Sequence, residues 1–138
     1  MIALSAAFES ALARLEAVGY GALSDSERLL ATIWWLEGDV NNGGFDQYYF
    51  NSGGNFAKLA PGALRFIGAH AAAQIVESAN ARFGPNGPPE SRNERQTALD
   101  ELRKADPVAF ESLDAQFYRY PDDISGLLAA SLGLQENV

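Results

Sequence analysis

The stretch that decides the fold is VNNGGFDQYYFN, residues 40–51. Before it, apolar residues recur at helical spacing, and the adjacent glycines Gly43 and Gly44 interrupt that pattern because glycine favours turns over helix. The pattern resumes after the glycines, so we expect a second, short helical segment. On such a segment Gln47 and Asn51 lie four residues apart, and their amides share one face. The stretch therefore predicts a break between two helical segments, followed by an amide edge beside a cluster of aromatic side chains.

The rest of the chain follows the same helical spacing, and no run of four or more residues alternates as a half-buried strand would. Ser24 and Glu27 have the spacing of a capping box, which places the start of the helix that leads into the glycine break. Asp106 and Pro107 suit the N-cap and the first position of a later helix. We therefore predict one all-α domain over residues 1–138, a compact bundle of about seven or eight helices with no significant sheet.

Composition narrows the functional classes. The 138 residues, the usual size of one domain, include 18 acidic and 10 basic residues, and the net charge of -8 has the wrong sign for holding nucleic acid or an anionic membrane. The chain has no cysteine and a single histidine, His70, which leaves no thiolate nucleophile and no multi-histidine metal site. No signal peptide or membrane span is apparent. We expect a cytoplasmic protein that is not an enzyme, requires no cofactor or metal, and binds neither nucleic acid nor membrane directly.

The stretch 40–51 also allows a different hypothesis. Amide and carboxylate groups beside aromatic rings can line a small-molecule pocket. In that interpretation Asp46 is the general base of a binder or hydrolase that also uses the neighbouring polar and aromatic side chains Asn42, Gln47, Tyr48 and Asn51. The alternative, which we favour, is that the amides are buried, that they hydrogen-bond the backbone ends at the glycine breaks, and that they so fix the helices around the glycines. A deep pocket at these residues would support the first interpretation.

The same stretch resembles a known family. The residues that carry the resemblance are Asn41, Asn42, Gly43, Gly44, Phe45, Gln47, Tyr48 and Asn51, and weaker pieces follow in the expected order at residues 63–69, 110–118 and 120–123. Together they resemble the bacterial DNA mimic protein (DMP) family, whose shared domain is otherwise of unknown function. The resemblance implies an all-α fold and, for the studied type of member, an acidic dimer that occupies the DNA-binding surface of a transcription factor. The motif itself is mostly uncharged and looks like a fold signature.

Mimicry of DNA needs carboxylates gathered on one surface, because duplex DNA carries about one charge per 1.7 Å of its axis. Residues 1–40 hold six acidic and two basic residues, and residues 106–123 hold five acidic residues against one arginine. The candidate partner-binding residues are the five carboxylates of the second segment, Asp106, Glu111, Asp114, Asp122 and Asp123. We expect them to bind a basic DNA-binding protein, with a homodimer doubling the charge. An inhibitor or immunity partner of a cationic protein has the same electrostatics, and so does acidity that serves solubility alone.

Overall fold

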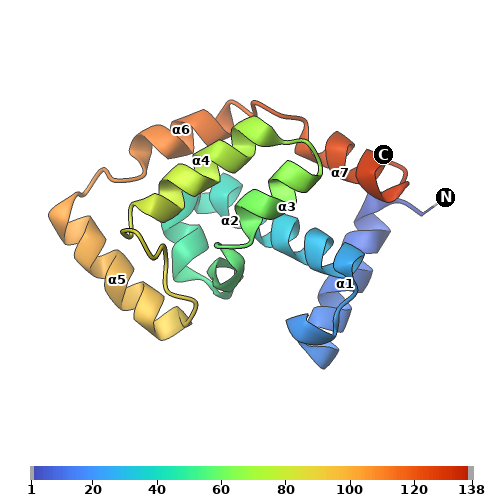
Figure 1. The fold of residues 1–138 in the computed structure, drawn as a ribbon, viewed down its shortest axis with the longest axis horizontal. Helices are drawn as coiled ribbons and strands as arrows, with labels where there is room; N and C mark the ends of the chain where they lie inside the picture. Colours follow the sequence, from blue (N-terminus) through green and yellow to red (C-terminus); the bar gives the residue numbers. More distant parts are fainter. Residues whose placement is uncertain (1, 137–138) are drawn as a thin grey trace.

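The computed structural model describes residues 2–136, which form an all-α fold (Figure 1). Within this range the β-structure is a single isolated bridge between Ala3 and Gln135. The elements run in the order α1 (Leu4–Val18), η1 (Tyr20–Ala22), α2 (Asp25–Phe50), η2 (Ser52–Phe56), α3 (Ala60–Phe66), α4 (His70–Ala81), α5 (Arg92–Ala105), α6 (Glu111–Tyr118) and α7 (Ile124–Leu132), where η marks a short 3₁₀ helix. The predicted fold class and helix number are thereby confirmed.

The central helix is α2. The predicted capping box fixes its start, because the Ser24 hydroxyl accepts the Glu27 N–H at 3.1 Å and the Glu27 carboxylate accepts the Ser24 N–H at 2.8 Å. Its apolar residues lie on more than one side, so α2 packs against α1, α3, α5, α6 and η2. Figure 1 shows α2 in the middle of the molecule, with α1 and α5 on opposite sides of it.

The glycine break is a kink inside α2. Gly43 has φ -153° and ψ 20°, and Gly44 has φ 74° and ψ -175°, so neither residue has helical backbone. The Gly44 combination lies in a region that is essentially restricted to glycine. Helical geometry then resumes at Phe45 and ends at the C-cap Asn51, after which η2 begins. The predicted break and second helical segment are confirmed.

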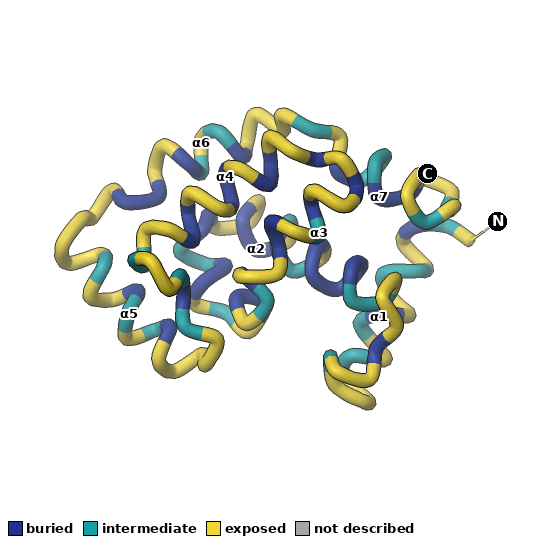
Figure 2. Tube along the Cα trace, viewed as in Figure 1, coloured by how far each residue is buried: buried dark blue, intermediate teal, exposed yellow. Residues whose placement is uncertain are grey.

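The core lies around α2 and α4. α4 packs against α3 on one side and α6 on the other, and the buried apolar residues of all these helices form one continuous cluster. Figure 2 shows the buried positions concentrated along α2 and α4, while α5 exposes most of its length. No helix formed by residues 2–136 is long and apolar enough to cross a membrane.

The junction between α5 and α6 differs from the prediction. Asp106 is the C-cap of α5, not the N-cap of the next helix, and its carboxylate accepts the Val108 N–H at 3.2 Å. Pro107 lies in the turn that follows, and α6 begins only at Glu111. An aspartate followed by proline suits a turn as well as a helix start, because the aspartate side chain can bond the backbone two residues on.

Candidate functional site

The amides of the glycine motif surround a buried carboxylate. The side-chain nitrogens of Gln47 and Asn51 each donate to Oδ1 of Asp39, both at 3.1 Å, and Asn42 donates to Oε1 of Gln47 at 3.0 Å. The predicted shared face of Gln47 and Asn51 is confirmed, and its amides bond Asp39, a residue that is only 7% exposed. The expectation that the amides are buried and bond the backbone is wrong, because Asn42, Gln47 and Asn51 donate to side chains and none of the three is fully buried. Asp39 lies one residue before the motif and was missed as a site residue. The signal that could have found it is its position between buried apolar residues of one helix.

Two buried polar atoms beside this network, Asp39 Oδ2 and the Tyr48 hydroxyl, have no hydrogen-bond partner among residues 2–136. A Cβ at Gly53 would lie 3.1 Å from Asp39 Oδ2 and 2.7 Å from Cβ of Trp35, so glycine is needed there for η2 to approach α2. Burial raises the pKa of Tyr48, an effect that Arg95 opposes and Asp39 reinforces. Burial therefore favours the neutral form of the Tyr48 hydroxyl.

Asp114 joins α6 to the kink of α2. Its Oδ1 accepts the Phe45 N–H at 2.9 Å, which satisfies a backbone donor that the kink releases from the helix. A Cβ at Gly44 would lie 2.6 Å from Asp114 Oδ2. Burial raises the pKa of Asp114, the bond from Phe45 lowers it, and the charge of Asp46 raises it again. This predicted partner-binding residue is half-buried and has a role within the fold.

Arg95 of α5 forms hydrogen bonds with the C-terminal end of the motif. It is fully buried although it lies on α5, a helix whose alternating charges indicate a solvated surface, and sequence reasoning missed it for that reason. Its guanidinium donates to the end of α2, to Asn55 and to the loop before α5; the acceptors are the carbonyls of Tyr49 (2.6 Å), Asn51 (2.8 Å), Pro89 (3.2 Å) and Glu90 (3.0 Å) and Oδ1 of Asn55 (3.0 Å). One side chain therefore holds three separate segments together.

Two of the other predicted carboxylates lie between α6 and α7. Asp122 accepts the Ala72 N–H at 2.8 Å and so caps the first turn of α4 across the fold. Asp123 is the N-cap of α7 and accepts the Gly126 N–H at 3.2 Å. Asp123 thus caps the last helix, whereas Asp122 bonds the start of a different helix, α4. Each carboxylate has acceptor capacity beyond the one backbone bond that it accepts.

The structure brings the remaining predicted residues together. Asp106, Glu111 and Asp114 line a hollow of about 130 Å³ between the end of α5 and the start of α6, and Asp46 of the motif also lines it. The side chain of Arg103 reaches the same hollow and pairs with Asp46 at 3.0 Å. We call the set Asp46, Asp106, Glu111 and Asp114 the acidic hollow. Its four carboxylates outnumber its one arginine, so it presents a local excess of negative charge.

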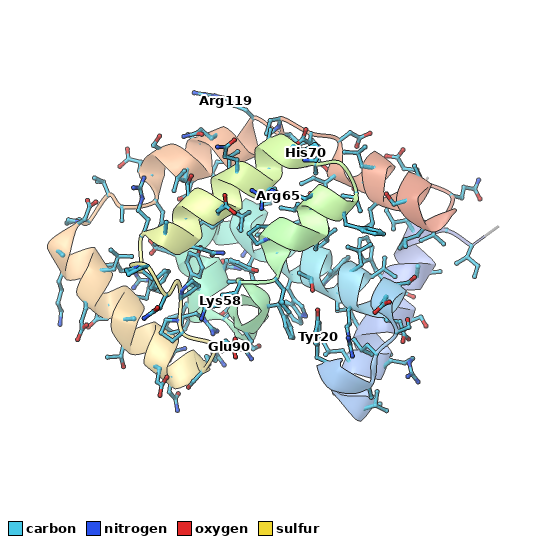
Figure 3. The ribbon with its side chains drawn as sticks, in the orientation of Figure 1. Tyr20, Lys58, Arg65, His70, Glu90 and Arg119 are labelled. Carbon is cyan, nitrogen blue, oxygen red and sulfur yellow. The ribbon has the colours of Figure 1, made fainter. Side chains whose placement is uncertain are left out.

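The five predicted carboxylates thus form two groups, one at each end of α6. Asp106, Glu111 and Asp114 belong to the acidic hollow, and Asp122 and Asp123 lie beyond the other end of the helix. Arg119 lies between the groups in the chain, and Figure 3 shows its side chain extending outward from the molecule. Within residues 2–136 no three His, Asp or Glu side chains form a group that could hold a metal ion.

Comparison with known proteins places the chain in a family. A family model described as DMP19-like protein matches residues 21–137. No curated protein and no solved structure matches the chain. The matched range includes the kinked helix, the buried Asp39 network, Arg95 and both groups of carboxylates. The chain therefore belongs to the family of DMP19-like proteins.

Proposed function

We propose that this protein is a non-enzymatic acidic protein that binds a basic DNA-binding protein, such as a transcription factor, and competes with DNA for it. The observation that carries the proposal is the acidic hollow, in which carboxylates from α2, α6 and the α5–α6 turn converge in a member of this family. Carboxylates spaced along one edge of a protein can pair with the arginines and lysines that otherwise contact phosphates.

One copy of the chain carries less negative charge than the turn of duplex DNA with which it would compete. One copy carries a net charge of -8, whereas one turn of duplex carries on the order of 20 phosphates. A homodimer would double the charge, and we propose that two copies act together. The helix-capping carboxylates Asp122 and Asp123 would add to the negative electrostatic potential of this surface as well, since accepting a backbone hydrogen bond does not neutralise a carboxylate.

The motif residues support this function over a small-molecule site. Gln47 and Asn51 use their amide groups on Asp39, and Asn42 uses its own on Gln47. Asp46, the expected general base of the alternative, makes an ion pair with Arg103. These groups are engaged with one another, which is the arrangement expected if the motif maintains the fold.

The proposal is tested by capture followed by displacement. The immobilised full chain is incubated with bacterial lysate, bound proteins are eluted with rising salt, and each identified DNA-binding protein is purified with its DNA site. We expect the free chain to release the DNA in a gel-shift assay, with an affinity that falls steeply with ionic strength. Capture of neutral or acidic proteins alone, or failure to release DNA, would contradict the proposal.

A pair of variants locates the surface. The double variant Asp106→Asn with Glu111→Gln removes two exposed charges of the acidic hollow, and its control, Glu16→Gln with Asp25→Asn, removes two exposed charges elsewhere. We expect the first variant to weaken displacement more than the second, because short-range pairing adds to the general field. Equal weakening by both variants would exclude the acidic hollow as the contact surface. Displacement of a cationic protein from a ligand other than DNA would favour an inhibitor of cationic proteins.

A further inference from the structure

A second surface, separate from the acidic hollow, lies between α1 and α7, against the part of α2 that precedes the kink. Two hollows of about 330 and 390 Å³ share Phe8, Trp34 and Ser125, and so form one groove. We call it the Trp34 groove and define it by Leu4, Phe8, Trp34, Glu37, Gly38 and Ser125. Trp34 is 43% exposed, and the centroid of its ring lies 5.0 Å from that of Phe8. The floor of the groove is therefore an accessible aromatic surface held in place by a second ring.

The charged side chains that line the groove are all acidic. They are Glu9 on α1, Glu37 on α2 and Glu136 in the segment after α7. No arginine, lysine or histidine among the described residues lines it, and the ion pairs found within residues 2–136 involve other carboxylates. The groove thus combines an apolar floor with carboxylates that no cation of the described chain neutralises.

Glu37 lines the same hollow as Trp34 and lies on the same helix, α2. Burial raises its pKa, a hydrogen bond from Tyr120 lowers it, and the charge of Asp123 raises it again. A partly buried carboxylate next to a second carboxylate gains from a cation, because an opposite charge favours its ionised form. A side chain with an apolar body and a positively charged end would therefore complement both the aromatic floor and the carboxylates of the groove.

Arginine fits these requirements better than lysine does. Its guanidinium is planar, is more weakly hydrated than an ammonium group, and stacks on aromatic faces, of which tryptophan is the most favourable. The negative rim repels nucleic acid and anionic lipid, which carry the same sign of charge. The chemistry of the groove therefore favours a basic protein segment as its occupant.

We propose that the Trp34 groove binds an arginine side chain carried by a basic segment of a protein partner, with the guanidinium over the Trp34 ring and paired with Glu37. The inference deepens the proposed function and rests on it for the positive charge of the partner. It assigns to that partner a specific anchoring side chain, at a surface distinct from the acidic hollow.

The test uses the full chain and a defined probe, the peptide acetyl-Gly-Arg-Leu-Arg-Gly-amide. Binding is followed by the indole N–H signals of Trp34 and Trp35 in a nitrogen–proton correlation spectrum. We expect a saturable shift of the Trp34 signal that is absent with the same peptide carrying citrulline in place of arginine. A shift that is unchanged by citrulline, or one confined to Trp35, would overturn the proposal.

Two matched pairs of variants locate the contact. Glu37→Gln should weaken binding about tenfold, as the loss of one charge-assisted contact does, whereas Glu16→Gln on α1 outside the groove should leave it unchanged. Gly38→Leu should abolish binding, because a Cβ at Gly38 meets no atom within 4 Å and the larger side chain fills the groove without disturbing the helix. Gly62→Leu on α3, equally unobstructed, is its control. Unchanged binding by both Glu37→Gln and Gly38→Leu would overturn the assignment.

The two proposals fail in different ways. If the peptide does not bind but the chain still displaces DNA from a captured protein, the groove assignment is wrong and the proposed function stands. If the peptide binds with the expected dependence on Glu37 and Gly38 but no DNA is displaced, the groove stands and competition with DNA is wrong. A shift of the Trp34 signal with protein concentration, in the absence of peptide, would assign the groove to a second copy and overturn the proposal.

Discussion

The two ends of α2 belong to one helix but differ in how far neighbouring elements cover them. At the C-terminal end, beyond the kink, α5, α6 and η2 pack against the helix. There Gln47 and Asn51 bond Asp39, while Asp114 and Arg95 bond backbone groups of α2. Farther toward the N-terminus, Trp34 and Glu37 face a groove that α1 and α7 leave open. Figure 2 shows α1 mostly exposed or half-buried along its length.

The contrast teaches that most residues of the motif which identifies the family make contacts within the fold, although Asp46 also lines the acidic hollow and Asn41 lines the Trp34 groove. The C-terminal end of α2 is closed by internal bonds, so substitutions there change stability first. The groove and the exposed members of the acidic hollow, Asp106 and Glu111, have few contacts within the fold, so we expect substitutions there to change binding first. Asp114 is the exception, because it also bonds the kink. Four predictions separate these two kinds of residue, from the largest expected effect to the smallest.

Arg95→Ala should cause the largest loss of stability. The variant leaves four backbone carbonyls and the Asn55 side chain without their donor in a buried site, and we expect a loss of at least about 3 kcal/mol of unfolding free energy. Arg92→Ala is the control, since Arg92 is exposed and donates one bond, to the Phe50 carbonyl. Denaturant unfolding measures both variants. Similar losses in the two would show that the buried guanidinium contributes little.

Two glycines of α2 provide the second comparison. Gly44→Val places a β-branched side chain at φ 74° and against the Asp114 carboxylate, so we expect a loss of about 3 kcal/mol or failure to fold. Gly38→Ala lies in regular helix with open space around the new Cβ, and should stabilise the protein by up to about 1 kcal/mol. Thermal unfolding of both variants checks the signs. A stabilising effect at position 44 would contradict the kink geometry.

Sequence patterns were sufficient for the helices because helical periodicity and capping are local properties. The capping box at Ser24 and Glu27, the break at Gly44 and the shared face of Gln47 and Asn51 all depend on residues that are close in the chain. For the same reason the sequence predicted an all-α fold with a glycine break in the right place.

Long-range contacts set the limits of the sequence analysis. Asp114 bonds Phe45 and Asp122 bonds Ala72, and no local pattern distinguishes such carboxylates from exposed ones such as Glu111. Arg95 lies in a charged helix whose pattern gives no sign of burial. The error at Asp106 has a local cause, since the same dipeptide suits a turn and a helix start.

Variants of Asp114 test whether its carboxylate stabilises the fold, in addition to any role in partner binding. Asp114→Ala removes the acceptor of the Phe45 N–H, and we expect a loss of about 1–2 kcal/mol. Asp114→Asn keeps an acceptor oxygen and should lose less, while Glu111→Ala, at an exposed position, should leave stability nearly unchanged. Chemical denaturation orders the three variants. If Asp114→Ala is as stable as Glu111→Ala, the bond to the kink does not stabilise the fold.

The pH dependence of stability gives the smallest effect. Because the pKa of Asp114 is raised in the folded protein, the folded state binds this proton more tightly than the unfolded chain, whose aspartates titrate at about 3.9. The stabilisation from this proton is therefore complete below about pH 3.9, and it is lost as the pH rises through the pKa of Asp114 in the folded protein. Asp114→Asn, which has no carboxyl to ionise, should show a flatter decline over this window than the native chain. A carboxyl signal of Asp114 that titrates below 3.9 by nuclear magnetic resonance would reverse the sign and show that the bond from Phe45 outweighs burial at this end of α6.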